Sequence, residues 1–315
     1  MIDLYQECAD LVNQVPKGMV TTYGTVAKAL GDDIAKRAVG VMLNTYGPPI
    51  KMPCHRVVYS GGGLGGFAYG LPRKMEMLAA EGVYEREGKI ADFDEIFFDK
   101  FKSNFPLKKA RKEQLDLAKK VELEDPKKMP NLVLGLDASY IGTRALGAGV
   151  LFNIADKKVV ETFISESKIN WPYVPTYLGF RELPVYRKII DQLDEPAILM
   201  VDGNGTLHPH KFGIASHLGV ELKMPAIGVA KSRLCGELVA MPKGHGESQP
   251  VLLKGREIGR ALKTTLRAKP IFVSPGHEIS MASALKITMK IAKLKLPEPT
   301  RLAHIEATAM RRSAL

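Results

Sequence analysis

The apolar pattern of the chain changes near residue 131, and this change constrains the fold more than any other feature. After Asn131, short apolar runs of strand length alternate with amphipathic helical stretches, as in NLVLGLDASY, LGAGVLFNI and PAILMVDG. Such alternation predicts an α/β domain, because helices must cover the faces of a sheet. Residues 1–83 instead predict short helices around glycine-rich turns. We therefore expect a multi-domain chain.

A charge-dense stretch over residues 84–130 separates the two patterns. Within it, Leu107, Leu115 and Leu117 predict a modest helix over residues 107–122, interpreted as a solvated surface helix that follows a linker. We expect a first domain at residues 1–88, a linker at 89–104 and a second domain at 105–315.

The charge of the chain is uneven. The net charge is +11, and residues 131–315 hold 25 basic against 16 acidic residues, whereas residues 1–90 hold ten against nine. A basic second half makes a polyanionic partner such as nucleic acid plausible, although charge alone is weak evidence.

The cysteines and the apolar runs indicate the cellular compartment in which the protein is expected. The three cysteines, Cys8, Cys54 and Cys235, form neither a disulfide framework nor a zinc-site spacing, and they indicate a reducing compartment. The N-terminus lacks a signal-peptide pattern, and no apolar run approaches the length of a membrane span. We expect a cytoplasmic monomer without a membrane partner.

Residues 21–47 predict two helices joined by a tight turn. Thr22 caps the first helix, Gly31 ends it, and a second helix runs from Ile34 to Asn44. Its predicted apolar face consists of Ile34, Ala38, Val41 and Met42. The opposite face carries Lys36, Gly40 and Asn44, with Arg37 beside them. Such a pair is typical of a helix-turn-helix DNA-binding element, and an ordinary surface helix is the alternative.

The stretch PCHRVV (residues 53–58) places Cys54 directly beside His55. A lone cysteine is most often a small buried hydrophobic residue, but a neighbouring base converts a thiol to the reactive thiolate. On an extended strand the two side chains point to opposite faces, so cooperation requires a turn or a bridging water. A cysteine hydrolase is disfavoured, because the sequence contains no oxyanion-hole motif.

Three acids of the second half follow a strand–helix–strand order. Asp137 ends an apolar strand, Glu182 lies on a helix predicted over residues 178–191, and Asp202 ends the buried strand of PAILMVDG. Carboxylates at the ends of neighbouring strands meet at one sheet edge and supply the oxygen ligands that Mg²⁺ prefers. Each acid alone could be a surface residue, but the three together indicate an RNase H-like nuclease.

Residues 21–83 resemble the C-terminal domain of O6-alkylguanine-DNA alkyltransferases, through TTYGTVAKAL, KRAVGVMLN, PCHRVV, GGLGGFAYGL and LAAEGV. The resemblance implies a mainly helical, winged-helix-like domain that flips the damaged nucleotide out of the duplex. It implies that Cys54 accepts the alkyl group irreversibly, and that Glu81 and His55, the latter through a water, activate the thiol.

The same resemblance assigns residues that handle DNA. It implies that Asn44 lies at the hinge beside the site and that Arg37 takes the space left by the flipped nucleotide. Tyr23 would rotate the base and protonate the departing guanine. The loop text GGFAYG differs from the tyrosine–small-residue text common in the family, and we expect the usual N-terminal domain of the family to be absent. These departures leave open the range of alkyl groups and the stability of the domain.

Residues 131–305 resemble endonuclease V. The matching text is LDASY, WPYVPTYLGFREL, VDGNGTLHPHKFGIASHLGV, IGVAKSRLCG, IFVSPGHEIS and PEPTRLAHI. The resemblance implies an α/β RNase H-like domain with a mixed central sheet. It implies that Asp137 and Asp202 bind the metal, that Glu182 completes the acidic centre, and that Lys231 and His277 lie beside the scissile phosphate.

The endonuclease V resemblance also assigns residues to the substrate base. Tyr173 of PYVP would be inserted where the deaminated base was, and Leu178, Gly203 and Gly213 would line the base pocket. It assigns no role to Asn204, and His208 is interpreted as structural or phosphate-adjacent.

Together these resemblances predict a bifunctional DNA-repair protein. One part would transfer alkyl groups from O6-alkylguanine in double-stranded DNA to Cys54 without a cofactor. The other would incise DNA on the 3′ side of deoxyinosine with Mg²⁺, or alternatively Mn²⁺. Two alternatives remain open: a first part that only senses lesions, and a nuclease that acts mainly on inosine-containing RNA.

Overall fold

The computed structural model describes residues 2–45 and 52–314, and the chain divides into two compact units. The first unit comprises Met1–Lys112 with Asn170–Pro175, and the second comprises Glu113–Ile169 with Thr176–Leu315. Residues 89–104, interpreted above as a linker, are thus grouped with the first unit. The predicted surface helix is α5 (Pro106–Ala118), and its Leu107 is fully buried, so this helix is not merely a solvated one.

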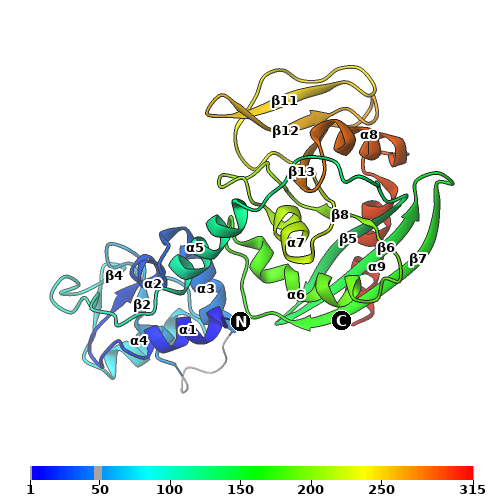
Figure 1. Ribbon diagram of the computed structural model, residues 1–315. Helices are drawn as coiled ribbons and strands as arrows, with labels where there is room; N and C mark the ends of the chain where they lie inside the picture. Colours follow the sequence, from blue (N-terminus) through cyan, green and yellow to red (C-terminus); the bar gives the residue numbers. More distant parts are fainter. Residues whose placement is uncertain (1, 46–51, 315) are drawn as a thin grey trace. The chain divides into compact units, whose positions relative to one another are not determined.

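The first unit is mainly helical, as expected (Figure 1). Its strands are only two residues long, and β1 pairs with β2 in parallel. Its elements before α5 are α1 (Leu4–Val12), β1 (Thr21–Thr22), α2 (Tyr23–Leu30), η1 (Asp33–Ala35), α3 (Lys36–Thr45), η2 (Cys54–Arg56), β2 (Val57–Val58), α4 (Leu71–Ala79), β3 (Glu85–Arg86) and β4 (Lys89–Ile90).

Helix α2 is capped at both ends as predicted. The Thr22 hydroxyl accepts a hydrogen bond from the Thr25 N–H at 3.1 Å, and Gly31 ends α2 in the left-handed conformation at φ 110°. The second helix differs from the prediction, because a 3₁₀ turn precedes α3, which begins at Lys36.

The predicted buried face of this second helix was wrong in part. The buried residues of α3 are Ala38, Val39, Met42 and Leu43, whereas Val41 is 52% exposed. Apolar residues at positions 38, 39, 41, 42 and 43 fit two overlapping arcs of a helix, and spacing alone does not choose between them.

The second unit is built on a nine-stranded mixed sheet in the order β10-β11-β12-β13-β9-β8-β5-β6-β7. The neighbours β5, β8 and β9 run parallel, while the other pairings are antiparallel. The strands are β5 (Leu132–Ile141), β6 (Arg144–Asn153), β7 (Lys158–Lys168), β8 (Ile198–Asp202), β9 (Ala226–Ala230), β10 (Glu237–Leu238), β11 (Ser248–Leu253), β12 (Arg256–Leu262) and β13 (Ile271–His277).

Helices cover both faces of this sheet (Figure 1). The four helices are α6 (Leu178–Ile190), α7 (Ile214–Leu222), α8 (Met281–Ile291) and α9 (Glu298–Ser313). Helix α9 lies so close to β5 that a side chain at Gly135 would collide with Pro299. On the other face, a side chain at Gly149 would collide with Ile189 of α6. Glycines in two strands thus permit close packing of helices on opposite faces.

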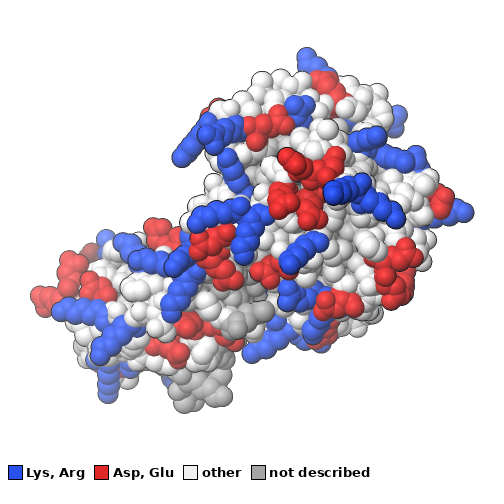
Figure 2. All heavy atoms as spheres, viewed as in Figure 1, with Lys and Arg blue, Asp and Glu red and all other residues white. Residues whose placement is uncertain are grey.

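Charged side chains are interspersed on the face of the second unit shown in Figure 2, with basic and acidic groups alternating across it. The basic surplus of this half therefore does not form a single uninterrupted patch on that face. None of the helices in the described part of the chain combines the length and apolar character needed to cross a bilayer.

Candidate functional sites

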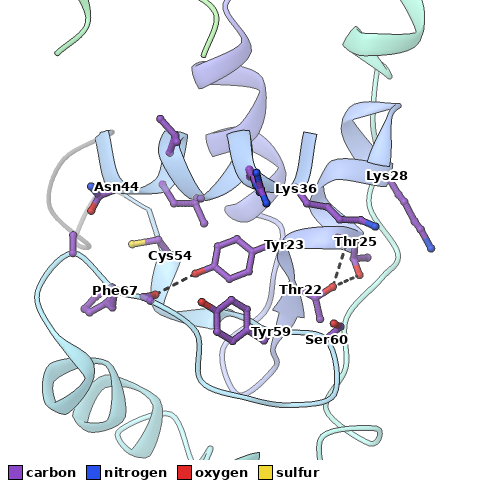
Figure 3. A pocket seen from close by; sticks show the side chains of 17 residues that line it. Thr22, Tyr23, Thr25, Lys28, Lys36, Asn44, Cys54, Tyr59, Ser60 and Phe67 are labelled. Carbon is purple, nitrogen blue, oxygen red and sulfur yellow. Dashed lines mark hydrogen bonds between the residues drawn. The ribbon is translucent and has the colours of Figure 1, made fainter. Parts of the chain in front are cut away.

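Cys54 begins the single-turn 3₁₀ helix η2 and is only 6% exposed. This turn resolves the problem posed by adjacent side chains on a strand, because Cys54 and His55 do not lie in extended backbone. The thiol borders a pocket of about 790 Å³. Asn44 of α3, Tyr23 of α2 and Phe67 of the following loop surround it (Figure 3). The structure therefore brings together three of the predicted alkyl-transfer residues.

The Glu81 carboxylate is hydrogen-bonded to the imidazole of His55. Its oxygen Oε1 lies 2.9 Å from Nε2 of His55. Arg56 donates from Nε and Nη2 to the two carboxylate oxygens at 2.8 and 2.7 Å, and from Nη1 to the Val15 carbonyl at 2.7 Å. This paired arrangement fixes the carboxylate, which in turn orients the imidazole.

This geometry determines the protonation states of Glu81 and His55. Burial alone would raise the pKa of Glu81, but the hydrogen bonds from Arg56 and His55 hold it at about 2, so the carboxylate is ionised at neutral pH. An ionised carboxylate only accepts hydrogen bonds, so the proton of a neutral His55 lies on Nε2 and its Nδ1 is the acceptor. Nδ1 is buried, and it has no hydrogen-bond partner among the described residues. It is therefore available to receive a proton.

Lys74 is a further residue of this site that the sequence interpretation missed. It is fully buried, and its ammonium donates hydrogen bonds to the carbonyls of Val57 at 2.6 Å and Gly66 at 3.4 Å, as well as to that of Leu64. Burial lowers the pKa of Lys74 to about 8, against the effect of the Cys54 charge. Burial raises the pKa of the Cys54 thiol, and the Lys74 charge opposes that rise.

The mouth of the thiol pocket is basic. Lys28 of α2 and Lys36 and Arg37 of α3 line it, together with Gly40. A side chain at Gly40 would lie 3.7 Å from the Tyr23 ring. The basic edge predicted for the second helix is thus on the wall of the same pocket that holds the thiol.

A second cluster lies where β5 and β8 run side by side. Asp137, Asp202 and His304 each offer one ligand atom, and these atoms all lie within 4.8 Å of one another. The two acids were predicted, whereas His304, on α9, was not. Nδ1 of His304 lies 2.6 Å from Oδ2 of Asp137.

This cluster fits a divalent cation. Burial and the negative charge of Asp202 raise the pKa of Asp137, so the two carboxylates repel each other and a cation would relieve that repulsion. Nζ of Lys231 lies 2.6 Å from Oδ2 of Asp202, which places the predicted lysine beside the cluster. Two carboxylates and one imidazole suit Mn²⁺ as well as Mg²⁺.

Glu182, the third predicted acid, is not one of these three ligand residues, although the negative charge of Asp137 contributes to raising its pKa, so it lies near the cluster. Its carboxylate accepts a hydrogen bond from Tyr140 and one of 3.0 Å from Tyr186. Asp137 bonds to α9 on one face of β5, whereas Tyr140, three residues later, bonds to α6 on the other, because side chains alternate along a strand. Burial raises the pKa of Glu182 to about 7, although both tyrosines oppose the rise.

His277 is not brought to the acidic cluster either. It pairs with Ala226 at the start of β9, whereas Asp202 pairs with Val229 near the end of that strand. At about 3.3 Å per residue, this offset places His277 roughly 10 Å away along the strand. Its Nδ1 accepts a hydrogen bond from the Glu122 N–H at 3.2 Å, and the side chain is buried.

The residues assigned to the substrate base are dispersed over several elements. Leu178 is the first residue of α6, and Tyr173 is 57% exposed within the segment grouped with the first unit. Gly203 donates its N–H to Val229 and Gly213 donates to Gly205. The amide donors of both glycines are thus already used inside the protein.

Comparisons with protein families divide the chain as its fold does. The endonuclease V family matches residues 115–305, and the DNA-binding domain of 6-O-methylguanine DNA methyltransferase matches residues 3–83. A bifunctional methyltransferase/endonuclease of Picrophilus torridus is 34% identical over 313 residues, which cover 99% of this chain and 98% of that protein. The protein of the same name from Thermoplasma volcanium is 32% identical over 96% of this chain and 88% of that protein.

Solved structures support the second part. Endonuclease V of Streptomyces avermitilis is 34% identical with a TM-score of 0.62, covering 66% of this chain and 93% of that one. Endonuclease V of Ciona intestinalis, in complex with a 24mer DNA containing an inosine followed by a ribo-adenosine, is 26% identical with a TM-score of 0.59. It covers 66% of this chain and 99% of that one.

Proposed function

We propose one reaction for each of the two sites of this chain, which belongs to the bifunctional methyltransferase/endonuclease family and carries an endonuclease V domain. The first unit transfers an alkyl group from O6-alkylguanine in DNA to Cys54. The second unit incises DNA on the 3′ side of deoxyinosine at the cluster of Asp137, Asp202 and His304. The observation that carries the proposal is the occurrence in one chain of a buried, base-assisted thiol and a separate cation-binding cluster.

The hydrogen bond from His55 to Glu81, beside Cys54, suggests how the alkyl group is transferred. The Cys54 proton passes to Nδ1 of His55, directly or through a water, while Glu81 stabilises the imidazolium that forms. The thiolate attacks the alkyl carbon, so an S–C bond forms as the bond from that carbon to O6 breaks. The departing guanine takes a proton from the Tyr23 hydroxyl, and the proton held by the His55 imidazolium then restores that hydroxyl through solvent. Cys54 is consumed because a thioether does not release its alkyl group under these conditions.

Access to the thiol requires the damaged nucleotide to leave the duplex. Lys36 on α3 would bind a backbone phosphate, and Arg37 is assigned to the space left by the nucleotide. Asn44, at the C-terminal end of α3, then borders the flipped base. These roles rest on the basic wall of the pocket around Cys54.

For incision, Asp137, Asp202 and His304 would hold a divalent cation, assigned as Mg²⁺ with Mn²⁺ as the alternative. Such a cation supplies Lewis-acid stabilisation of the phosphoryl group and lowers the pKa of a bound water. Lys231, beside Asp202, is placed to neutralise charge that develops on the scissile phosphate. Glu182, a neighbour of Asp137 whose carboxylate is held by two tyrosines, is assigned to complete the acidic centre.

Recognition of the deaminated base is assigned to the start of α6 and the loop after β8. Leu178 supplies an apolar contact, and Gly203 and Gly213 permit close approach of the backbone. Because their N–H groups are already donated, backbone carbonyls or other amides must read the base. Tyr173 is assigned as the side chain inserted into the space that the base leaves.

The decisive experiment measures both reactions on one preparation. Incubation with O6-methylguanine DNA should add one methyl group to the Cys54 peptide by mass spectrometry, with the Cys8 and Cys235 peptides as internal controls. Cys54→Ser should abolish this transfer and retain incision of deoxyinosine DNA, and Asp202→Ala should do the reverse. An unmodified Cys54 would support a lesion sensor instead.

A parallel assay addresses the substrate of the nuclease. Deoxyinosine DNA and inosine-containing RNA of the same sequence should be cleaved side by side, with Asp202→Ala as the inactive control. Faster cleavage of the DNA supports the proposal, and faster cleavage of the RNA would replace it with an RNA-directed function.

A further inference from the structure

One face of α9 continues beyond the proposed metal ligand toward the C-terminal end of the helix. His304, Thr308 and Arg312 are four residues apart and therefore lie in a row along the helix. Ala303 and Ala307 are fully buried and belong to a cluster with residues of β6, so the row lies beside the packed face. The row borders a pocket of about 430 Å³ whose other lining residues are Ile305, Ala309 and Ser313.

This pocket begins at the cation-binding cluster, because His304 belongs to both. Eight residues of α-helix separate the Cα atoms of His304 and Arg312 by about 12 Å. Long side chains on a helix lean toward its N-terminus, so the Arg312 side chain is long enough and favourably directed to extend toward the cluster. At about 3.4 Å of rise per nucleotide, the reach of Arg312 falls within about three nucleotides of a phosphate at the cluster.

The chemistry of the row suits a phosphate. None of the pocket-lining residues is acidic, and Arg312 is exposed. Within the described part of the chain, neither Arg312 nor the Thr308 hydroxyl has a side-chain hydrogen bond or an ion pair. A guanidinium binds phosphate through two parallel hydrogen bonds, and a hydroxyl adds a third donor.

Arg312 could instead serve only the helix, because basic residues in the last turn of a helix interact favourably with the helix dipole. That role would serve Arg311 and Arg312 equally and would be indifferent to DNA. The continuity of the Arg312 row with the metal-ligating histidine favours a substrate contact.

We propose that Thr308 and Arg312 form a backbone-phosphate subsite, which holds the cleaved strand within about three nucleotides of the scissile bond. The inference rests on the proposed nuclease function and adds a subsite to it. The contact is to phosphate, so it contributes affinity and register without reading the base.

The test uses the full chain and deoxyinosine duplexes in which single phosphates near the cleavage site are replaced, one at a time, by uncharged methylphosphonates. Binding is measured by fluorescence anisotropy in EDTA, which prevents metal-dependent cleavage. For the wild type, one position should weaken binding by about tenfold. Arg312→Gln should already bind about tenfold more weakly and should lose less than twofold at that position. Its slope of log K against log salt should fall by about 1.

Two variants separate charge from location. Arg312→Lys should keep the sensitive position and the salt slope. Arg256→Gln, the same charge change at the start of β12, which is four strands away from β5 in the sheet, should leave the methylphosphonate profile unchanged. Thr308→Ala should reduce the effect at the same phosphate.

The outcomes are distinguishable. A wild-type chain that does not incise deoxyinosine DNA refutes the proposed function and this subsite with it. A wild type that incises, with a methylphosphonate profile that Arg312→Gln leaves unchanged, refutes the subsite alone. A lower melting temperature of Arg312→Gln with an unchanged profile would assign Arg312 to helix stability.

Discussion

Replacing Glu81 by Gln should destabilise the first unit through loss of charge, with little change of shape. The pKa of Glu81 is about 2 against an ordinary 4.5, and its side chain is only 11% exposed. Because one pKa unit corresponds to 1.36 kcal/mol, the folded unit favours the carboxylate over its protonated form by roughly 3 kcal/mol. Glu81→Gln should lower the stability of the unit at pH 7 by about that amount, since Arg56 is left largely buried without its partner.

The sign of the pH dependence follows from the lowered pKa. The stability due to the charge is fully present above pH 4.5 and is lost as the pH falls through about 2. The difference between wild type and Glu81→Gln should therefore shrink from about 3 kcal/mol at pH 7 to less than half of that at pH 3.

Cys8 provides the assay within the full chain. It is 1% exposed on α1, so a thiol reagent reaches it only when the first unit opens. Pulses of dithiodipyridine at increasing urea, with peptide mass readout of Cys8, give the unfolding midpoint of that unit alone. At a slope of about 2 kcal/mol per M urea, the midpoint of Glu81→Gln should fall by about 1.5 M at pH 7.

The matched control is Glu76→Gln, which removes a carboxylate paired with Arg73 where both side chains are more than half exposed. Its midpoint should move by no more than the equivalent of about 0.5 kcal/mol. If Glu81→Gln lowers the midpoint equally at pH 7 and pH 3, the charge argument is wrong and Glu81 acts through packing.

Three further substitutions test the sites. Lys74→Met should raise the pKa of Cys54 and slow its alkylation by at least tenfold at pH 7, because it removes the opposing positive charge; an unchanged pH profile of iodoacetamide labelling would contradict this. In EDTA, the second unit should lose stability as the pH rises from 4.5 to about 7, the ordinary and folded pKa values of Glu182, and Glu182→Gln should reduce that loss in scanning calorimetry. His304→Ala should weaken Mn²⁺ binding at least tenfold by electron paramagnetic resonance, whereas Thr308→Ala should bind Mn²⁺ normally.

Local patterns predicted the elements of the second unit well. The apolar runs that predicted β5, β6 and β8 each became a strand, and α6 begins at the predicted residue. The strand containing Asp137 continues to Ile141, although it was expected to end at the acid. Residues 138–141 are only half-buried and include the polar Ser139, so they lack the uninterrupted apolar signal of a buried strand.

Residues contributed from distant parts of the chain were harder to predict. His304 meets Asp137 across 167 positions of sequence, and no spacing rule connects a helix near the C-terminus to a strand near the middle. Lys74 was missed because lysine is rarely buried. Its three carbonyl partners come together only when the loop over residues 57–66 folds around it.

The positions of the site residues along the chain also determine the order in which the two sites can form during protein synthesis. The residues of the thiol site end at Glu81, whereas the cation-binding cluster needs His304 near the C-terminus. A ribosome releases the chain from its N-terminus and domains fold as they emerge. We therefore expect a nascent chain to acquire its alkyl-accepting site long before its nuclease centre can close, so that no half-made chain cuts DNA.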